Sequence, residues 1–265
     1  ATRALLARAR RSLGEALAAF EFLDAPALGM ALADEAGRGG GRARNAAAVH
    51  PLPASPDPLF ILVEAAGADP AHDAQKMETL LEGALGAGEA SDGVAASGSA
   101  QAAALWALRE GAPLALKSAG GAVYKYDVSV PVRAMWGVVE EARARVAAAS
   151  GSSGGREGPD DPTHHHPPPR VVAYGHLGDG NLHLNVSAPG GRTPALDAAL
   201  EPWVYEAVSA AGGSLSAEHG VGLLKAPHLG LAQSAGALAL MRAVKAAWDP
   251  RGILNPYKMF PAVGG

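Results

Sequence analysis

The sequence contains no cysteine among its 265 residues. Disulfide bonds and thiolate metal sites are therefore excluded, and any metal ion must be held by nitrogen and oxygen ligands. No apolar run reaches the roughly 18 residues that a membrane-spanning helix needs. Lys and Arg form no dense cluster and the formal net charge is -4, so the composition argues against nucleic-acid binding.

The composition that remains is typical of a soluble globular chain, with 48% hydrophobic and 18% charged residues. This length is enough to bury a core in one large domain or two small ones. The chain begins with Ala1 and enters a helical pattern directly, so we expect a fragment or processed form. Its localisation is not readable from these residues.

Two histidines flank a tight glycine-rich turn in the stretch that runs from Tyr174 to Val186. The second half of this stretch alternates strictly between polar residues (Asn181, His183 and Asn185) and apolar ones (Leu182, Leu184 and Val186). This period of two predicts a half-buried strand with a polar face, in a strand pair over 170–187.

An adjacent Glu218–His219 pair follows about thirty residues later, before Gly220. His176, His183 and Glu218 are a sufficient donor set for Zn²⁺, Mn²⁺ or Co²⁺ with an open position for substrate, and His219 could move protons. The alternative is structural: each histidine hydrogen-bonds within the core, and His219 packs under a helix. The residues alone leave both interpretations open.

Other polar residues carry weaker signals. Arg109 is a candidate anion ligand or a solvated helix edge, and Lys125 is a candidate anion ligand or the partner of Asp127 in a surface ion pair. Asp179 is expected to hydrogen-bond its own turn. The glycines at 175–180 lack the helix and the Lys-Ser/Thr ending of a phosphate-binding loop.

The periodicity predicts an α+β fold, in which an antiparallel sheet is flanked by helices. Helices are expected at 5–20, 25–36, 70–85, 101–110, 133–148, 194–211 and 234–248. Strands are expected at 59–64, 93–97, 123–130 and 213–218 beside the pair at 170–187. Residues 37–57 and the His/Pro/Gly-rich stretch at 149–170 are expected to be low-complexity inserts.

The stretches 174–186 and 216–222, supported by Phe20–Asp24, 123–131 and Asp249–Pro256, resemble the C-terminal catalytic domain of D-2-hydroxyglutarate dehydrogenases. These belong to the FAD-linked oxidoreductases, together with D-lactate dehydrogenases and glycolate oxidase subunits. The resemblance covers the chain from 1 to 265 except the two inserts. It implies the same α+β fold with a small helical C-terminal tail.

The resemblance also implies a role for each candidate residue. His176, His183 and Glu218 would hold a divalent metal, expected to be zinc, and His219 would be the catalytic base. The substrate would be bound by Arg109, Lys125 and Asn185. The flavin would be approached by Asn255 and Lys258.

The implied reaction is the FAD-dependent oxidation of a D-2-hydroxy acid, D-2-hydroxyglutarate to 2-oxoglutarate, by metal-assisted proton abstraction and hydride transfer to flavin. Two cationic side chains suit a dicarboxylate. The resemblance further implies a mitochondrial location and an electron-transfer flavoprotein as acceptor. The family's N-terminal FAD-binding domain is absent from this chain, so we expect the chain alone to be inactive.

Two departures from the family pattern bear on the site. Gly111-Ala-Pro113 is expected to form a longer loop after Arg109, where the family offers a hydroxyl, and Tyr257 replaces a glycine. Three alternatives remain: a non-catalytic metal-binding fragment that needs a separate flavin domain, a D-lactate or glycolate dehydrogenase, and a metallohydrolase without flavin.

Overall fold

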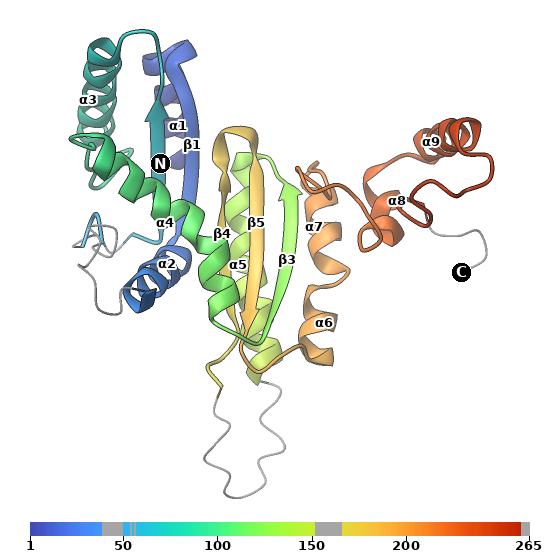
Figure 1. The fold of residues 1–265 in the computed structure, drawn as a ribbon. Coiled ribbons are helices and arrows are strands. Elements are labelled where there is room, and N and C mark those ends of the chain that lie inside the picture. The colour runs from blue at the N-terminus through green and yellow to red at the C-terminus, as the bar shows by residue number, and fades with distance from the viewer. Residues whose placement is uncertain (39–49, 54, 56, 152–165, 261–265) are drawn as a thin grey trace, which may run out of the picture. The chain divides into compact units, whose positions relative to one another are not determined.

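The computed structural model describes residues 1–38, 50–53, 55, 57–151 and 166–260. Its five strands form one sheet in the order β2-β1-β4-β5-β3 (Figure 1). The chain divides into two compact units. Unit 1 consists of Ala1–Tyr124, Pro162–Asp179 and Asn185–Arg192, and unit 2 consists of Lys125–Asp161, Gly180–Leu184 and Thr193–Gly265.

Unit 1 holds most of the N-terminal elements. These are α1 (Thr2–Leu13), β1 (Leu17–Asp24), α2 (Ala25–Arg38), β2 (Leu59–Ala65), α3 (Pro70–Gly86), α4 (Ser99–Ser118) and β4 (Arg170–His176). β1 pairs antiparallel with both β2 and β4, and the register places Glu21 opposite His176. A buried cluster joins the sheet to α2 and α4 through Leu23, Ala27, Ala112, Leu116, Val172 and Tyr174.

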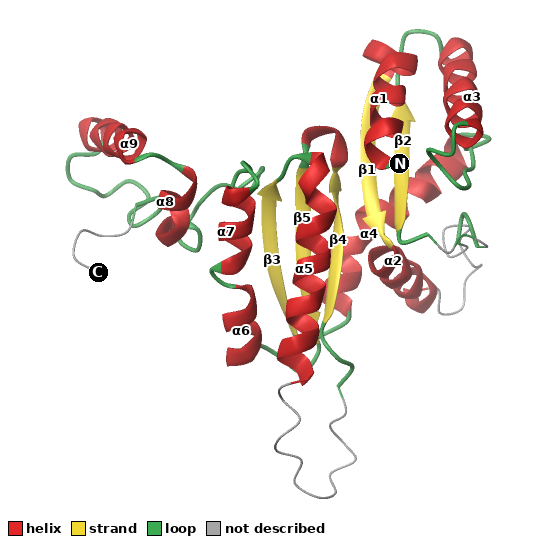
Figure 2. Ribbon diagram, turned by 180° about the vertical axis from the view of Figure 1, so that it is seen from behind, coloured by secondary structure: helices red, strands yellow, loops and turns green. Residues whose placement is uncertain are grey.

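Unit 2 holds the helices α5 (Val132–Gly151), α6 (Pro194–Leu200), α7 (Trp203–Ala210), α8 (Leu229–Ala232) and α9 (Ala235–Trp248). The unit boundary runs through two strands, β3 (Ala122–Ser129) and β5 (Asn181–Ala188). Figure 2 shows α5 lying across the face of β5 and β3. Its apolar stripe accounts for this position, since Met135, Val138, Val139, Ala142 and Val146 are all buried.

The predicted α+β class and antiparallel sheet are confirmed, and so are the helices at 25–36, 70–85, 133–148 and 234–248 to within a few residues. α3 begins as its sequence indicates. Asp69 accepts from the backbone N–H groups of Ala71 and His72, and Pro70 occupies the first turn.

The helix predicted at 5–20 ends early. α1 stops at Leu13 because Gly14 takes a positive φ of 57°, and the chain passes through a 3₁₀ turn (Gly14–Ala16) before it enters β1. Phe20 and Phe22 are therefore buried strand residues. β2 is half-buried along most of its length, because it is the terminal strand of the sheet.

α4 continues well beyond the predicted end at residue 110. Gly111, Ala112 and Pro113 lie inside the helix, so the expected loop after Arg109 is wrong. The reason is tertiary: Ala112 and Leu116 pack into the buried cluster of unit 1, and this packing outweighs the local preferences of Gly and Pro.

Three other expectations fail. Residues 93–97 form no strand, and the helix at 194–211 is divided into α6 and α7 at Glu201–Pro202. Residues 213–218 form a loop with one isolated bridge, between Ser214 and Ser129. The centres of the two predicted inserts, 39–49 and 152–165, lie outside the described residues.

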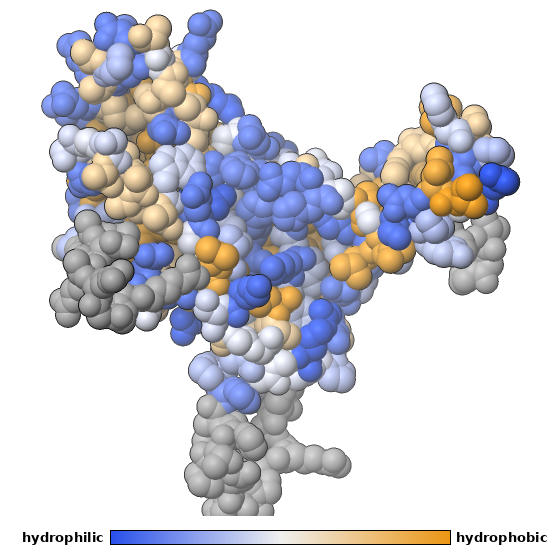
Figure 3. All heavy atoms as spheres, in the orientation of Figure 1, coloured by the Kyte–Doolittle hydropathy of each residue, from blue (hydrophilic) through white to orange (hydrophobic). Residues whose placement is uncertain are grey.

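The helical C-terminal tail is present, and none of the residues of α9 is buried. Apolar side chains stand exposed there and in the segment that follows, among them Leu240, Trp248, Ile253 and Tyr257. Figure 3 shows orange, hydrophobic surface at the C-terminal end of the chain. Across the described part of the chain, no helix combines the length and the apolar character needed to cross a membrane.

Candidate functional site

β5 places His183 on the polar face of its strand. Leu182, Leu184 and Val186 are fully buried, whereas His183 retains partial exposure and points to the opposite side. The alternating directions of these side chains are as predicted, but the strand is not half-buried, because Asn181 and Asn185 on the polar face are buried as well. Gly180 enters the strand at a φ of 73°, and its carbonyl oxygen accepts from Val130 N at 2.8 Å.

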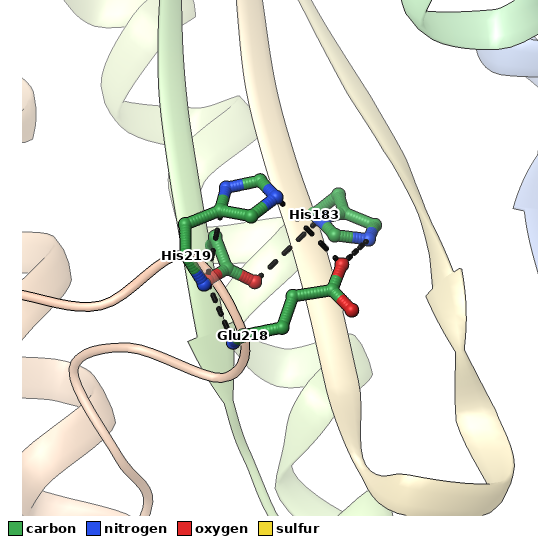
Figure 4. Close-up of side chains that lie close together, drawn as sticks. His183, Glu218 and His219 are labelled. Atoms are coloured by element: carbon green, nitrogen blue, oxygen red, sulfur yellow. Dashed lines mark hydrogen bonds and ion pairs between the residues drawn. The ribbon is translucent and has the colours of Figure 1, made fainter.

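The loop after Ser214 carries Glu218 and His219 to His183 (Figure 4). Glu218 Oε1 lies 3.2 Å from His183 Nε2 and 3.7 Å from His219 Nε2. The two imidazole rings are stacked, with their centroids 5.7 Å apart. Two imidazoles and one carboxylate thus converge, although Glu218 and His219 are neighbours in sequence.

Asp127 explains how two adjacent residues reach one place. Its Oδ2 accepts hydrogen bonds from Glu218 N at 3.0 Å and from His219 N at 2.8 Å. Both donors are main-chain N–H groups, so the carboxylate fixes the loop backbone at these two residues. Asp127 Oδ1 lies 3.7 Å from His183 Nδ1. One buried carboxylate therefore touches all three members of the group.

Lys225 lies beneath this carboxylate and is itself buried. Its Nζ donates to the main-chain oxygen of Asp127 at 2.8 Å and to Ser216 Oγ at 3.0 Å. The ammonium is also 3.8 Å from Asp127 Oδ2. The cation therefore secures both β3 and the loop that bears Glu218.

The electrostatics favour an ionised Asp127. Burial alone would raise its pKa, but hydrogen bonds from the backbone of His219 and Glu218, with the charges of His219 and Lys225, bring the pKa below its ordinary value. For Lys225, burial lowers the pKa despite the opposing attraction of Asp127. Asp127 and Lys225 therefore form a partly desolvated pair of opposite charges, in which each charge offsets the other.

Asp127, His183, Glu218 and His219 offer one ligand atom each within 4.8 Å of one another. Nitrogen and carboxylate oxygen are donors that zinc accepts, and bonds of about 2.0–2.2 Å would need only a modest contraction of this group. Asp127 Oδ1 is also buried without a hydrogen-bond partner. The donor set and this unsatisfied oxygen fit a divalent cation.

Unit 1 contains a second group of predicted site residues, organised by Glu21. Glu21 Oε1 lies 2.7 Å from His176 Nδ1, and Glu21 Oε2 accepts from Arg109 Nε at 2.9 Å. Arg109 also stacks over the Tyr174 ring at 5.0 Å. The Tyr174 hydroxyl in turn hydrogen-bonds the Asn185 side chain. His176, Arg109 and Asn185 are thus linked through side-chain contacts.

Burial raises the pKa of Tyr174, against the opposing influence of Arg109 and the Asn185 hydrogen bond. The phenol therefore stays protonated at neutral pH, available to donate. Asn185, predicted to lie beside substrate, is itself buried in this group.

The nine predicted site residues thus divide between the two units. His183, Glu218 and His219 come together in unit 2, whereas His176 belongs to the group around Glu21 in unit 1. Asn255 and Lys258 lie in the tail: Asn255 is exposed with a φ of 50°, and Lys258 Nζ contacts Pro256 O at 3.4 Å.

Three simpler interpretations are wrong. Arg109 is only 6% exposed, so it is not a solvated edge. Lys125 is exposed and makes no ion pair with Asp127, which is buried and paired with Lys225 instead. The exposed Asp179 side chain makes no hydrogen bond to its own turn within the described structure.

Sequence reasoning did not identify Asp127, Lys225 or Glu21 as parts of the site. The signal available for two of them was a carboxylate within a strand of buried aromatic and apolar residues: Glu21 follows Phe20, and Asp127 follows Tyr126. A buried acid in such a strand needs a partner. Lys225 offered no comparable local signal.

The fold and these two groups define a class of protein. The chain belongs to the family described as FAD linked oxidases, C-terminal domain, which it matches over residues 1–259. It is 42% identical over 255 residues to the mitochondrial D-2-hydroxyglutarate dehydrogenase of Bos taurus, covering 95% of this chain and 40% of that protein. It is 41% identical over 257 residues to the mitochondrial D-2-hydroxyglutarate dehydrogenase of Arabidopsis thaliana, covering 97% of this chain and 40% of that protein.

A more distant relative carries a different name. The D-2-hydroxyglutarate–pyruvate transhydrogenase of Saccharomyces cerevisiae is 34% identical over 260 residues, which cover 96% of this chain and 47% of that protein. The chain spans about two fifths of the length of the curated dehydrogenases that it matches.

Proposed function

We propose that the complete protein carrying this chain is an FAD-dependent D-2-hydroxyacid dehydrogenase that oxidises D-2-hydroxyglutarate to 2-oxoglutarate in mitochondria. This chain supplies the substrate and metal half. The observation that carries the proposal is the convergence of His183, Glu218 and His219 on the buried carboxylate of Asp127. The family match and the names of the relatives support the reaction class.

The proposed metal is zinc, with His176, His183 and Glu218 as its ligands. Asp127 and His219 stand beside two of these ligands and contribute negative charge and a further imidazole nitrogen. When bound, the metal would polarise the substrate hydroxyl and the flavin would take up the hydride from C2. Asn255 and Lys258 are the residues of this chain proposed to contact the flavin.

His219 is the proposed catalytic base. Its backbone N–H is held by Asp127 while its side chain is 65% exposed, so the imidazole is anchored at one end and accessible to substrate at the other. A neutral imidazole nitrogen accepts the hydroxyl proton, and the neighbouring Asp127 carboxylate stabilises the resulting imidazolium. General base catalysis of this kind contributes about 10²–10⁴-fold.

Arg109 and Lys125 are the proposed ligands of the substrate carboxylates, and Asn185 is the proposed neighbour of the hydroxy acid. A guanidinium and an ammonium together suit a dicarboxylate better than a monocarboxylate such as lactate. We propose an electron-transfer flavoprotein as the acceptor that reoxidises the enzyme.

The decisive experiment compares D-2-hydroxyglutarate with D-lactate and glycolate as substrates of the complete protein. The proposal requires kcat/KM to be highest for D-2-hydroxyglutarate, with 2-oxoglutarate as product. A much higher kcat/KM for D-lactate would contradict the proposed substrate and make the complete protein a D-lactate dehydrogenase. If this chain binds stoichiometric zinc without flavin or turnover, it acts as a metal-binding half that requires a separate flavin domain.

A further inference from the structure

Glu21 is a buried acid on a strand of apolar residues. Phe20, Phe22 and Leu23 surround it in β1, and Glu21 is only 4% exposed. A carboxylate is rarely buried in this way unless cations or hydrogen-bond donors compensate its charge. The partners of Glu21 therefore explain why the acid is there.

Each oxygen of Glu21 has its own partner. Oε2 receives both Nε and Nη2 of Arg109 at 2.9 Å, and Oε1 lies 2.7 Å from His176 Nδ1. The strand register supports the second contact, because Glu21 stands directly opposite His176 in the β1–β4 pairing. One side chain therefore holds two residues that the proposed function assigns to different tasks.

The contact with His176 selects a tautomer. An ionised carboxylate beside a guanidinium accepts hydrogen bonds but cannot donate one. In a neutral His176 ring whose Nδ1–H donates to Glu21 Oε1, the lone pair is on Nε2. Metal-bound histidines are oriented in this way by a carboxylate at their other nitrogen.

The contact with Arg109 sets both orientation and charge. Glu21 engages the Nε–Nη2 edge of the guanidinium, and the Tyr174 ring packs against its face. Nη1 lies outside the contact with Glu21. Because the carboxylate offsets the charge of Arg109, this arginine can offer a substrate directional hydrogen bonds but little net positive charge.

We propose that Glu21 is a positioning residue for the hydroxy-acid site, fixing the Nε2-binding tautomer of His176 and the orientation of Arg109. The proposal rests on the proposed function for the ligands involved. It also assigns the two cations unequal roles: the exposed Lys125 supplies net charge to a dicarboxylate, and Arg109 supplies geometry.

The first test needs no metal and no turnover. In long-range ¹H–¹⁵N spectra of the metal-free chain, His176 should show the neutral form protonated at Nδ1, and Glu21→Gln should abolish this single-tautomer pattern. A neutral wild-type His176 protonated at Nε2 overturns the proposal. This measurement on the wild type remains decisive even if the variant folds poorly.

The second test measures zinc affinity by competition with a chromophoric chelator. Glu21→Gln should weaken zinc binding about 10–100-fold, the usual effect of removing a carboxylate behind a metal-bound histidine. In the complete protein at saturating zinc, the KM for D-2-hydroxyglutarate should also rise severalfold, because Arg109 loses its orientation. Glu21→Asp should recover part of both effects.

Asp24→Asn is the matched control. Asp24 lies on the same strand, is fully buried, and accepts from the backbone N–H groups of Ala27 and Ala173. The Asp24→Asn substitution should lower the thermal midpoint of unfolding, while the zinc affinity of the variant stays within twofold of the wild-type value. Equal zinc losses in Asp24→Asn and Glu21→Gln would make the effect merely structural and overturn the proposal.

The same experiments distinguish a failure of the proposed function from a failure of the role proposed for Glu21. In that case the wild-type chain itself binds no zinc, or the complete protein does not oxidise the hydroxy acid, whatever occupies position 21. An unchanged zinc affinity and KM in Glu21→Gln, on an active wild-type background, refutes only the role of Glu21.

Discussion

Lys225 donates its closest hydrogen bond not to the carboxylate of Asp127 but to the main-chain oxygen of the same residue, at 2.8 Å. The carboxylate oxygen Oδ2 lies 3.8 Å from the ammonium and is left to the backbone N–H groups of Glu218 and His219. The ammonium of Lys225 thus offsets the charge of the carboxylate without displacing the two backbone N–H groups that donate to it. Asp127 can therefore be charged, buried and directed towards the candidate site at once.

This arrangement predicts that a substitution at Asp127 lowers both the stability of the chain and its affinity for zinc. Asp127→Asn removes a charged acceptor and leaves Lys225 buried without its counter-charge. The free energy of unfolding should therefore fall by about 1–3 kcal/mol, the usual cost of such a loss. Urea denaturation measures this change. Zinc affinity should fall as well, because the loop at 218–219 loses its anchor.

Lys225→Met is the companion variant in a double-mutant cycle with Asp127→Asn. If the two residues act together, the double variant should be less destabilised than the sum of the single variants. Strict additivity would show that Asp127 is held by its backbone partners alone.

Zinc should stabilise the isolated chain. A ligand that binds only the folded state adds about 2.7 kcal/mol when its concentration is 100 times Kd. We therefore expect zinc to raise the thermal midpoint and a chelator to reverse the change. His183→Ala should remove most of the response, whereas His228→Ala, whose ring stacks on Tyr205 outside the group, should retain it. An equal response in both variants would contradict the assignment of His183.

His219→Ala should separate catalysis from metal binding. Because His219 is the proposed base rather than a ligand, kcat of the complete protein should fall by about 10²–10⁴-fold. Zinc content, measured by mass spectrometry, should remain stoichiometric. Loss of the metal in this variant would instead make His219 a ligand within the group of four donors.

The tail should respond to acid through Asp249. Its carboxylate accepts from Lys245 Nζ at 2.6 Å and from the backbone of Ile253 and Leu254, and these bonds, led by the one from Lys245, lower its pKa. A depressed pKa stabilises the segment at pH values above the ordinary aspartate value of about 3.9. This contribution is lost as the pH falls through the lower, folded pKa.

An NMR titration of the Asp249 carboxyl carbon tests this expectation. The midpoint should lie below the ordinary value in the wild type and return towards it in Lys245→Met. A wild-type midpoint at or above the ordinary value would mean that the contacts of Asp249 do not persist in solution.

Local pattern was sufficient for several parts of the structure. The alternation that predicts β5 holds because strand geometry forces neighbouring side chains to opposite faces, whatever surrounds them. Asp69 and Pro70 start α3 through contacts within a few residues. The failures are of another kind: α4 passes through Pro113 because Ala112 and Leu116 pack into a core that lies elsewhere in the sequence.

The sequence by itself determined the donor chemistry: without cysteine, only histidine and carboxylate side chains can supply a metal site of this kind. It also determined which face of β5 His183 occupies. Only the tertiary structure decided the partners, since Glu21 meets Arg109 across 88 positions and Asp127 meets Lys225 across 98. Such contacts depend on how distant strands and loops come together, and no local periodicity records them.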